Sequence, residues 1–197
     1  MKLRKNSALA AILGAATGMA FGVFTASAAD LKPPSSLVNS GKLTYATAAT
    51  FAPFEYMEDG KLVGFDIEMM DEIAKRMGLE PNPLSMEFKG LIPALQGSRA
   101  DIINSGMYIK PERAKVVDFI PYMRVGNQLV VAAKNPHNIQ IVDNLCGLRV
   151  AVTLGGFQEG LANEQSKTCT EAGRKEVDVL TFPSAQDAAL ALKQGRA

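Results

Sequence analysis

The sequence predicts an α/β protein of two lobes, each built on a parallel sheet, with the second lobe incomplete. Short apolar runs alternate with amphipathic helical stretches in a β-α-β order, which is typical of parallel sheets covered by helices. The same order starts again after a break at Asn135-Pro136. We therefore expect the first lobe over residues 43–134 and the start of the second lobe over residues 135–197.

The N-terminus has the pattern of a secretory signal peptide over residues 1–28. Three basic residues precede an apolar stretch from Ala8 to Phe24, and Ala26-Ser27-Ala28 then supplies small residues for a signal peptidase. A retained membrane anchor is the alternative, because the apolar stretch is nearly long enough to span a bilayer. We expect cleavage near Ala28 and release into the periplasm of a two-membrane bacterium.

The charge of the expected mature chain is close to neutral. Removing residues 1–28 leaves 18 basic and 20 acidic residues, a net charge of −2. Nucleic acid or an anionic membrane would require a basic patch, and the basic residues here are scattered among acidic ones. Neither is an expected partner, so any specificity for an anion must be local.

Two cysteines, Cys146 and Cys169, occur in the part of the chain expected to reach an oxidising compartment. A disulfide between them is the leading interpretation, and two unrelated buried thiols are the alternative. The sequence has no Cys-x-x-Cys, and its single histidine, His137, lies in a turn. We therefore expect no metal site, no thiol nucleophile and no cofactor.

The first βα unit follows an irregular leader over residues 29–42. Its strand is expected at Leu43–Thr47, and Asp59-Gly60 is expected at the tip of a hairpin. Asp66 suits a helix N-cap and Gly78 a helix end. The apolar face of this helix is expected to comprise Ile67, Met70, Ile73, Ala74 and Met77.

The second unit continues the same order. We expect Leu84–Phe88 to be extended, Leu91–Gln96 to be helical and Ala100–Asn104 to form a strand. A further strand is expected at Gln128–Ala133, before the break that ends the lobe.

The second lobe begins with a strand at Arg149–Val152, a helix opened by Gly155-Gly156 and a strand at Val177–Phe182. Residues Ala191–Ala197 then resemble Ala94–Ala100, a helix end that leads into a strand in the first lobe. In the first lobe a strand follows this segment, but here the chain ends before the equivalent strand. We therefore expect a C-terminally truncated fragment that lacks part of its second lobe.

One loop carries groups suited to a small carboxylate. Ser105 and Gly106 follow an apolar strand and offer a hydroxyl and an unobstructed backbone N–H, and Arg113 begins a helix shortly after. A guanidinium matches a carboxylate with two parallel hydrogen bonds. The alternative is a surface arginine paired with Glu112 or Asp118.

Two further segments are expected to reach the same place, because ligands bind at the C-terminal ends of parallel strands. Phe51 follows the first strand, although it could equally be a core residue. Thr153–Gln158 joins a strand to a helix, where free N–H groups favour an anion. A nucleotide phosphate loop is disfavoured, because this segment lacks the Gly-Lys-Ser/Thr ending and the spaced glycines.

From about Leu43 to Ala197 the chain resembles the periplasmic solute-binding proteins of the polar amino-acid class, family 3. The resemblance implies a type II periplasmic binding protein fold, a monomer whose lobes close on an amino acid and deliver it to an ABC permease. The motifs that carry it are Ala52-Pro53-Phe54-Glu55, Leu62-Val63-Gly64-Phe65-Asp66-Ile67, Phe88-Lys89-Gly90-Leu91-Ile92-Pro93-Ala94-Leu95, Ser105-Gly106-Met107, Pro111-Glu112-Arg113-Ala114 and the segment from Val152 to Glu159.

The resemblance also implies roles for single residues. Arg113 would clamp the ligand α-carboxylate with the N–H groups of Gly106 and Gly156, and Phe51 and Phe88 would line the pocket for the ligand side chain. The complete set of expected ligand-binding residues is Phe51, Phe88, Ser105, Gly106, Tyr108, Arg113, Thr153, Gly156, Phe157 and Gln158.

Three residues depart from the family pattern. Tyr108 stands where Ser or Thr is usual, Ala48 replaces a common acidic residue, and Phe157 replaces a small hydroxyl residue. Together they indicate a pocket that is more apolar than that of a histidine or arginine binder. The carboxylate that grips the ligand ammonium in the family would lie beyond Ala197.

Two other functions are weighed against transport. Some relatives in this family resemble binding proteins yet act as cyclohexadienyl or arogenate dehydratases, and catalysis would require an acid or base in the cleft. Glu55 and Glu159 are the acidic residues near the cleft mouth, and we expect both to be structural or exposed. The other alternative is the sensor domain of a membrane receptor. We expect a transport protein and no enzyme.

Overall fold

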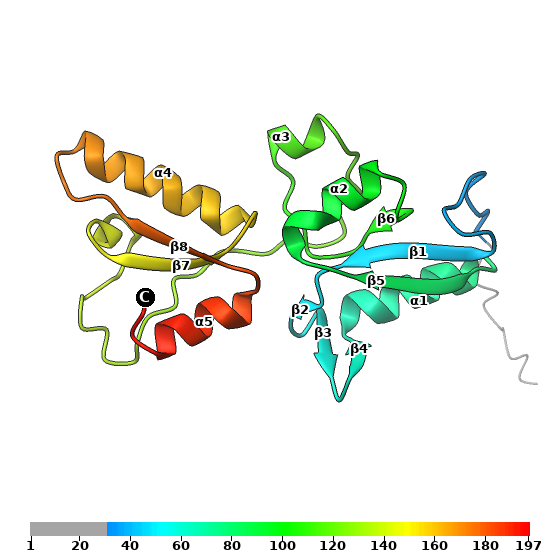
Figure 1. Cartoon of the computed structure of the whole chain (residues 1–197), viewed down its shortest axis with the longest axis horizontal. Helices are drawn as coiled ribbons and strands as arrows, with labels where there is room; N and C mark the ends of the chain where they lie inside the picture. Colours follow the sequence, from blue (N-terminus) through cyan, green and yellow to red (C-terminus); the bar gives the residue numbers. More distant parts are fainter. Residues whose placement is uncertain (1–30) are drawn as a thin grey trace, which may run out of the picture.

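The computed structural model describes residues 31–197, which form two α/β bodies joined by a long connecting segment (Figure 1). The N-terminal lobe holds a three-stranded parallel sheet and a small antiparallel sheet, and the C-terminal lobe holds a pair of parallel strands. The predicted α/β class with parallel sheets is therefore confirmed. The expected signal peptide over residues 1–28 lies outside the described residues.

The sheet of the N-terminal lobe is built around β1 (Lys42–Thr47). Strand β5 (Glu80–Ser85) pairs with it on one side and β6 (Ile102–Ile103) on the other, both in parallel. The expected strand at Leu43–Thr47 is confirmed and starts one residue earlier. Because β1 is central, every residue from Leu43 to Thr47 is buried, which explains its continuous apolar and small-residue pattern.

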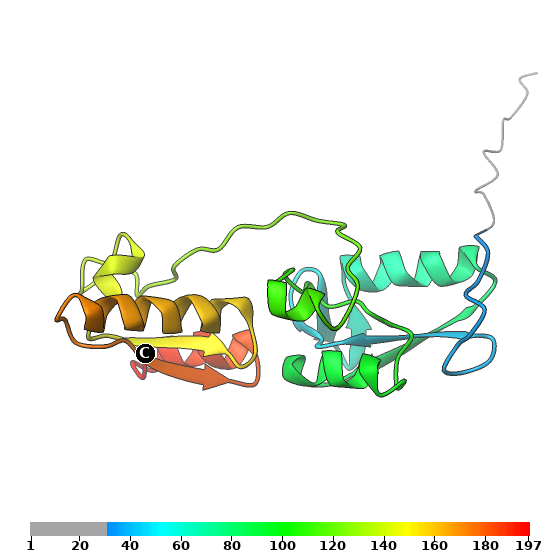
Figure 2. The same ribbon diagram turned by 90° about the horizontal axis from the view of Figure 1, so that it is seen from above.

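Two helices cover opposite faces of this sheet (Figure 2). Helix α1 (Phe65–Arg76) packs on the face that carries Leu43 and Tyr45, and α2 (Leu91–Gln96) packs on the face that carries Ala46. Alternate side chains of one strand therefore serve two separate cores. The first core comprises Leu43, Tyr45, Ile67, Met70 and Ala74, and the second comprises Ala46, Ala48, Leu91 and Ala100.

A small antiparallel sheet projects from the same lobe. It consists of β2 (Thr50–Phe51), β3 (Glu55–Glu58) and β4 (Lys61–Val63), with Asp59-Gly60 at the tip between β3 and β4. The predicted hairpin tip is confirmed. Gly60 has a positive φ of 76°, which suits glycine in a tight hairpin turn.

The expected strand at Leu84–Phe88 is misplaced. Strand β5 occupies Glu80–Ser85, and Phe88–Gly90 forms a short 3₁₀ helix, η1. Pro81 and Pro83 obscured the strand in the sequence, because proline cannot donate to a sheet. β5 lies at the edge of its sheet, where a missing N–H is tolerated.

Two other expectations in this lobe need correction. Asp66 is not the N-cap of its helix: Gly64 is, and Asp66 is fully buried in the first turn of α1. The expected strand at Ala100–Asn104 shortens to the two residues of β6, because only Tyr45 and Ala46 of β1 pair with it.

The connection between the lobes begins after α3 (Pro111–Ala114) and contains no helix or strand from residue 115 to residue 141. The expected strand at Gln128–Ala133 is therefore wrong for this structure. Its apolar residues could form a strand only beside a free sheet edge, and no strand of the described residues pairs with it. The break at Asn135 is real: its side chain bonds the backbone N–H and C=O of Ile139, which closes a turn.

The C-terminal lobe follows the predicted order. A 3₁₀ turn, η2 (Val142–Leu145), leads into β7 (Arg149–Thr153) and α4 (Phe157–Glu171), and β8 (Asp178–Phe182) pairs with β7 in parallel before α5 (Ala185–Lys193). Helices α4 and α5 lie on opposite sides of the strand pair (Figure 1). Both expected strands and the expected helix start are confirmed.

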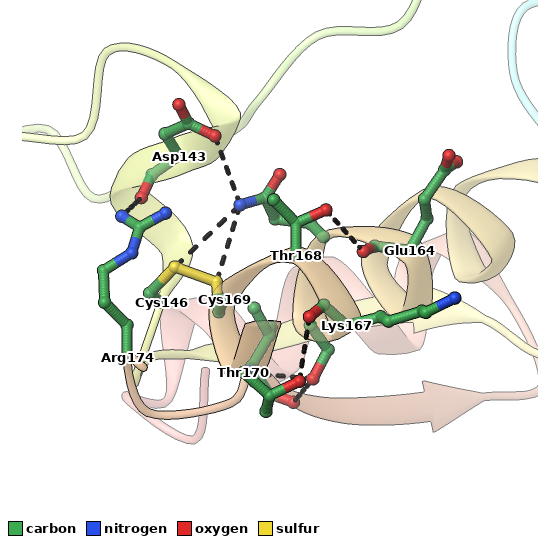
Figure 3. Close-up of a disulfide and its surroundings, with 11 residues drawn as sticks. Asp143, Cys146, Glu164, Lys167, Thr168, Cys169, Thr170 and Arg174 are labelled. Carbon is green, nitrogen blue, oxygen red and sulfur yellow. Dashed lines mark hydrogen bonds between the residues drawn. A yellow bond between two sulfur atoms is a disulfide. The ribbon is translucent and has the colours of Figure 1, made fainter. Parts of the chain in front are cut away.

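The predicted disulfide between Cys146 and Cys169 is present and joins the residue after η2 to the C-terminal part of α4 (Figure 3). The two Cα atoms lie 5.6 Å apart, within the usual range for a disulfide. Cys169 is fully buried and packs with Leu145 and Val177. The C-terminal part of α4 is thus covalently held, while its N-terminus is left to face the other lobe.

Candidate functional site

A cavity of about 880 Å³ lies between the two lobes. Its lining combines the strand ends of the N-terminal lobe and the connection with a larger contribution from the C-terminal lobe, where β7, α4 and α5 all line it. Every expected ligand-binding residue except Arg113 lines it. These are Phe51, Phe88, Ser105, Gly106, Tyr108, Thr153, Gly156, Phe157 and Gln158.

Phe51 is half-exposed at the end of β2, so it presents its ring to the cavity and is not a core residue. Its ring packs against Phe54 with 5.1 Å between ring centroids. Gly106 lies directly behind it: a Cβ added at Gly106 would come within 3.0 Å of Phe51 Cδ1, and Gly106 has a positive φ of 47°. Glycine at position 106 therefore sets both the turn and the position of the ring.

Ser105 is tied to the protein and not directed at a ligand. Its hydroxyl donates to Glu55 Oε1 over 2.6 Å and accepts the backbone N–H of Ala48 over 3.0 Å. Ser105 is buried, and Glu55 is only 1% exposed. The hydroxyl thus fixes the loop that carries Gly106.

Glu55 has an unusually high pKa for a glutamate. Burial raises its pKa from 4.5 to about 7; the hydrogen bonds that Ser105 and Thr47 donate to it lower the pKa, and the charge of Asp66 raises it. Thr47 Oγ1 lies 2.7 Å from Glu55 Oε2. The expectation that Glu55 is structural agrees with this burial.

Arg113 lies beside the cavity and bridges the lobes. Its Nη1 donates to the backbone O of Tyr108 and its Nη2 to the backbone O of Gly155, both over 2.8 Å. The guanidinium also lies over the ring of Phe88, 5.5 Å from the centroid. Neither Glu112 nor Asp118 pairs with it among the described residues, so the alternative of a surface ion pair is not observed.

The loop before α4 faces Arg113, and its backbone N–H groups are already bonded within the chain. Gly156, the N-cap, donates its N–H to Thr153 O over 3.0 Å. The N–H of Gly155 donates to Glu159 Oε2 over 2.6 Å. A carboxylate therefore already sits at this helix start, as the partial positive charge there favours, and it belongs to the chain itself.

Tyr108 and Phe157 stack on each other across the lobes, with ring centroids 4.6 Å apart and 17° between the ring planes. Lys110 lies over the Phe157 ring, with Nζ 5.4 Å from its centroid, and donates to Gly156 O over 3.3 Å. Gln158 Nε2 donates to Asn127 Oδ1 over 2.8 Å, which adds a bond between α4 and the connection.

Sequence reasoning did not single out Lys110 or Asn127, and it gave Glu159 no contact. Lys110 follows Gly106 by four residues, and this closeness in the sequence is a signal that could have indicated it. Nothing in the sequence around Asn127 indicates that the connection returns to the cavity.

Two classes of site are not found among residues 31–197. No group of three or more histidine, cysteine, aspartate or glutamate side chains is placed to hold a metal ion. Within the same range, none of the helices is long and apolar enough to cross a membrane.

Comparison with known families gives one match over most of the chain. Residues 43–194 match the family described as bacterial extracellular solute-binding proteins, family 3. The arginine-binding extracellular protein ArtP of Bacillus subtilis is 40% identical over 125 residues, covering 64% of this chain and 49% of ArtP. The arginine-binding protein ArgT of Corynebacterium glutamicum is 32% identical over 166 residues, covering 83% of this chain and 54% of ArgT. The chain thus spans about half the length of these curated relatives.

Solved structures give a consistent result. A Gly52Ala mutant of arginine-bound ArgBP from T. maritima superposes with a TM-score of 0.72 at 38% identity, over 80% of this chain and 70% of that one. The ancestral amino acid-binding protein AncCDT-1, a precursor of cyclohexadienyl dehydratase, superposes with a TM-score of 0.72 at 34% identity, over 80% of this chain and 67% of that one.

Proposed function

Because this chain belongs to family 3 of the bacterial extracellular solute-binding proteins, we propose that it binds an amino acid between its lobes and delivers it to an ABC permease. The observation that carries the proposal is the place of Arg113. Its guanidinium lies against Phe88 and reaches Gly155, in the loop before α4, at the edge of the cavity. A ligand carboxylate would exchange one of these backbone partners for a charge-assisted pair.

The ligand would be held by groups from both lobes. In the N-terminal lobe Arg113 and the backbone of Gly106 take the carboxylate, and the rings of Phe51 and Phe88 take the ligand side chain. In the C-terminal lobe the start of α4 closes over the bound ligand as the lobes approach. Names of relatives support an amino acid as the ligand, since ArtP and ArgT are both named as arginine-binding proteins.

The organisation of the chain is part of the same proposal. Lobe 1, counted together with the first part of the connection, extends over residues 43–134, and the second unit begins at residue 135, within the turn formed by Asn135. Residues 1–28 direct a monomeric protein to the periplasm. Relatives support this location: ArtP is named an extracellular protein, and an Escherichia coli relative is named a lysine/arginine/ornithine-binding periplasmic protein.

A dehydratase-like enzyme is the second candidate, favoured by the similarity to AncCDT-1. Among residues 31–197, however, the one acidic residue that lines the cavity is Glu55, and both of its oxygens accept hydrogen bonds from buried hydroxyls. A general acid must reach the substrate, and this carboxyl is covered.

A thermal-shift screen of the chain against the common amino acids tests the proposal. A ligand that binds only the folded state raises its stability, so one or a few amino acids should raise Tm. The matched control is the corresponding amino-acid amide, which lacks the carboxylate and should produce no shift. Absence of any shift, together with conversion of arogenate to phenylalanine, would replace the proposal by the enzyme.

A further inference from the structure

The cavity extends beyond the amino-acid site, along the edge of β7 that faces away from β8. All five residues of β7 line it and none of β8 does. Helices α4 and α5, which lie on opposite sides of the strand pair, also contribute to the lining (Figure 1), as do residues 127–132 of the connection. This part of the cavity, the β7 slot, therefore has a strand edge along one side and a helix on each face.

The free edge of β7 carries backbone groups that can bind a further strand. Leu148 O accepts the N–H of Asp178, and the N–H of Leu154 donates to Phe182 O, so the even-numbered residues of this stretch bond β8. Backbone groups of a strand alternate between its two edges, so the N–H and C=O of Ala151 point into the slot. No strand in the described part of the chain pairs with this edge. An open edge of this kind is a template for another strand.

The walls of the β7 slot suit apolar side chains. Leu161 of α4 and Leu192 of α5 line it, together with Leu129 and Val131 of the connection. Successive side chains of a strand point to opposite faces of its sheet, so a strand beside β7 would direct them alternately toward α4 and α5. The slot thus combines backbone partners along one edge with apolar surface on both faces.

The N-terminal lobe shows what occupies the equivalent edge there. Its central strand β1 has β5 on one side and β6 on the other, whereas β7 has β8 alone. The turn before β6 is repeated in the C-terminal lobe: Ala94 O accepts the N–H of Arg99 over 2.8 Å after α2, and Ala191 O accepts the N–H of Arg196 over 2.9 Å after α5. The two lobes therefore share one plan, in which the slot has the place of β6.

The contacts of β6 define the chemistry of the missing partner. Thr44 of β1 is the equivalent of Ala151, because each comes three residues after the carbonyl that accepts the first N–H of the neighbouring strand, Gly41 O and Leu148 O. Asp101 bonds both backbone groups of Thr44: its N–H donates to Thr44 O over 2.7 Å, and its Oδ2 accepts the Thr44 N–H over 2.8 Å. An aspartate at the start of a strand in the slot would bond Ala151 in the same way.

The end of the slot at which such a strand would start is basic. Arg149 begins β7, lines the cavity and donates from Nη2 to Gly195 O over 2.8 Å, in the turn after α5. His137 lines the cavity as well. Among the described residues, the one acidic side chain in the lining is Glu55, which belongs to the N-terminal lobe. An aspartate at the start of the strand would therefore meet a guanidinium.

We propose that the β7 slot binds one extended peptide segment of a partner protein, as a strand that runs parallel to β7. The segment carries an aspartate followed by apolar residues, as Asp101-Ile102-Ile103 does in the N-terminal lobe. Main-chain hydrogen bonds to the edge of β7 supply affinity, and the apolar walls select the side chains. This binding goes beyond the proposed function, because it uses a part of the cavity separate from Arg113 and Gly106.

Fluorescence anisotropy of a labelled synthetic peptide with the sequence of residues 98–105 tests the proposal with the whole chain. The peptide should bind saturably. The matched control is the same peptide methylated on the backbone nitrogen of Asp101, which loses the N–H meant for Ala151 O and keeps every side chain. Its Kd should be about 5- to 150-fold higher, because one buried acceptor is left unpaired. No binding, or equal affinity of the two peptides, would overturn the proposal.

Ala151→Pro locates the binding site. Proline removes the N–H that points into the slot and leaves the hydrogen bonds between β7 and β8 intact, so the Kd of the peptide should rise by a similar factor. Leu190→Ser, on the exposed side of α5, is the control and should bind as the wild type does. Should Ala151→Pro fail to fold, Leu192→Glu places a charge on the apolar wall of the slot and should weaken binding as well.

Hydrogen exchange of the wild-type chain gives an independent readout of the same site. At a peptide concentration of 100 times Kd, the amide of Ala151 should exchange about 100-fold more slowly, while amides of β1 keep their rates. Protection that appears in β1 instead would mean that the peptide has replaced β6, which would overturn the proposal.

Two further outcomes separate this inference from other occupants of the cavity. The amino acid identified by the thermal-shift screen should leave the peptide bound, and displacement of the peptide would show that both share one place. The chain alone should sediment as a monomer. A dimer that dissociates when peptide is added would show that a second copy fills the edge. Either result would overturn the proposal and leave amino-acid binding untouched.

Discussion

The rings of Tyr108 and Phe157 stack nearly parallel across the two lobes, 4.6 Å between centroids. Tyr108 follows β6 in the N-terminal lobe, and Phe157 is the first residue of α4 in the C-terminal lobe. Both residues are ones that we expect to depart from the family pattern, and in the structure they contact each other. The pair therefore forms an aromatic contact between the two lobes.

Removing this contact should shift the lobes toward an open arrangement. Aromatic pairs contribute about 0.5–1.5 kcal/mol beyond their buried area, so Tyr108→Ser or Phe157→Thr should raise the ratio of open to closed protein about 2- to 13-fold. Single-molecule energy transfer between dyes on the β3–β4 tip and the exposed face of α4 measures that ratio. The double variant should open little further than either single one, and Leu190→Ser, on the exposed side of α5, should have no effect. Additive effects would show that the rings act separately.

Arg113→Ala should abolish most ligand binding. By analogy with charge pairs at interfaces, losing one partner costs about 2–5 kcal/mol, or about 30- to 5,000-fold in Kd. Titration calorimetry with the amino acid identified in the thermal-shift screen provides the measurement. Arg99→Ala is the matched control, since Arg99 is exposed beyond the end of α2. Unchanged affinity in Arg113→Ala would mean that the carboxylate lies elsewhere.

Gly106→Ala should weaken binding through Phe51. The added Cβ would come within 3.0 Å of the Phe51 ring, and the backbone has a positive φ that costs other residues about 1–2 kcal/mol. We expect at least about a fivefold rise in Kd. Gly126→Ala provides the control, because nothing lies within 4 Å of its added Cβ and its φ is not positive. Equal affinities for the two variants would contradict the claim that Gly106 affects ligand binding through the position of the Phe51 ring.

Loss of the disulfide should loosen the C-terminal lobe alone. Closing a loop with a sequence separation of 23 contributes about 3 kcal/mol on the chain-entropy model. In a Cys146→Ser/Cys169→Ser variant, amides of α4 should therefore exchange with deuterium about 150-fold faster. Amides of β1, in the other lobe, serve as the internal control and should be unaffected. Uniform loss of protection would mean that the lobes unfold as one unit.

Folding stability should fall as pH rises through the neutral range. Glu55 has a pKa near 7 in the folded protein and 4.5 ordinarily, so the folded state holds the proton more tightly. Its contribution is fully present below pH 4.5 and is lost as pH rises to about 7, on the order of 3 kcal/mol in total. Urea unfolding at pH 5 and pH 8 should show this loss in the wild type and a smaller loss in Glu55→Gln.

The remaining slope in that variant is expected to come from Asp66, whose pKa burial also raises. Glu80→Gln removes an exposed carboxylate in a surface pair with Lys42 and should keep the wild-type dependence. If the stability of Glu55→Gln falls with pH as steeply as that of the wild type, the buried carboxyl of Glu55 does not titrate in this range.

Much of the fold could be predicted from local sequence. The strands at β1 and β7 are bounded apolar runs, and the disulfide followed from the count of two cysteines in a secreted-type chain. The predictions that were wrong concern features that depend on tertiary neighbours. Gln128–Ala133 has a strand pattern, but whether it pairs depends on a free sheet edge elsewhere. Asp66 fits an N-cap in sequence, yet packing buries it in the first turn of α1 beside Tyr122.

The site was partly predictable for the same reason. Residues at strand ends, such as Phe51 and Ser105, gather at one edge because parallel strands all end there. The direction in which each group points is set by its contacts: Ser105 donates to Glu55 although its position suggested a ligand, and Gly156 donates its N–H to Thr153 in a local turn. Ser105 and Glu55 are far apart in the sequence, and a contact of that kind produces no periodic sequence pattern.

Within the described residues, a single segment, residues 115–141, joins the two lobes. It contains no helix or strand. Such a tether makes the lobes behave as two binding partners at a fixed, high local concentration, on the order of millimolar. At that concentration, attraction of about 4 kcal/mol suffices to keep them together half of the time. The stacked rings and the hydrogen bonds of Arg113, Lys110 and Gln158 are of that order together. Small changes in these few contacts should therefore be enough to alter how much of the time the two lobes stay together.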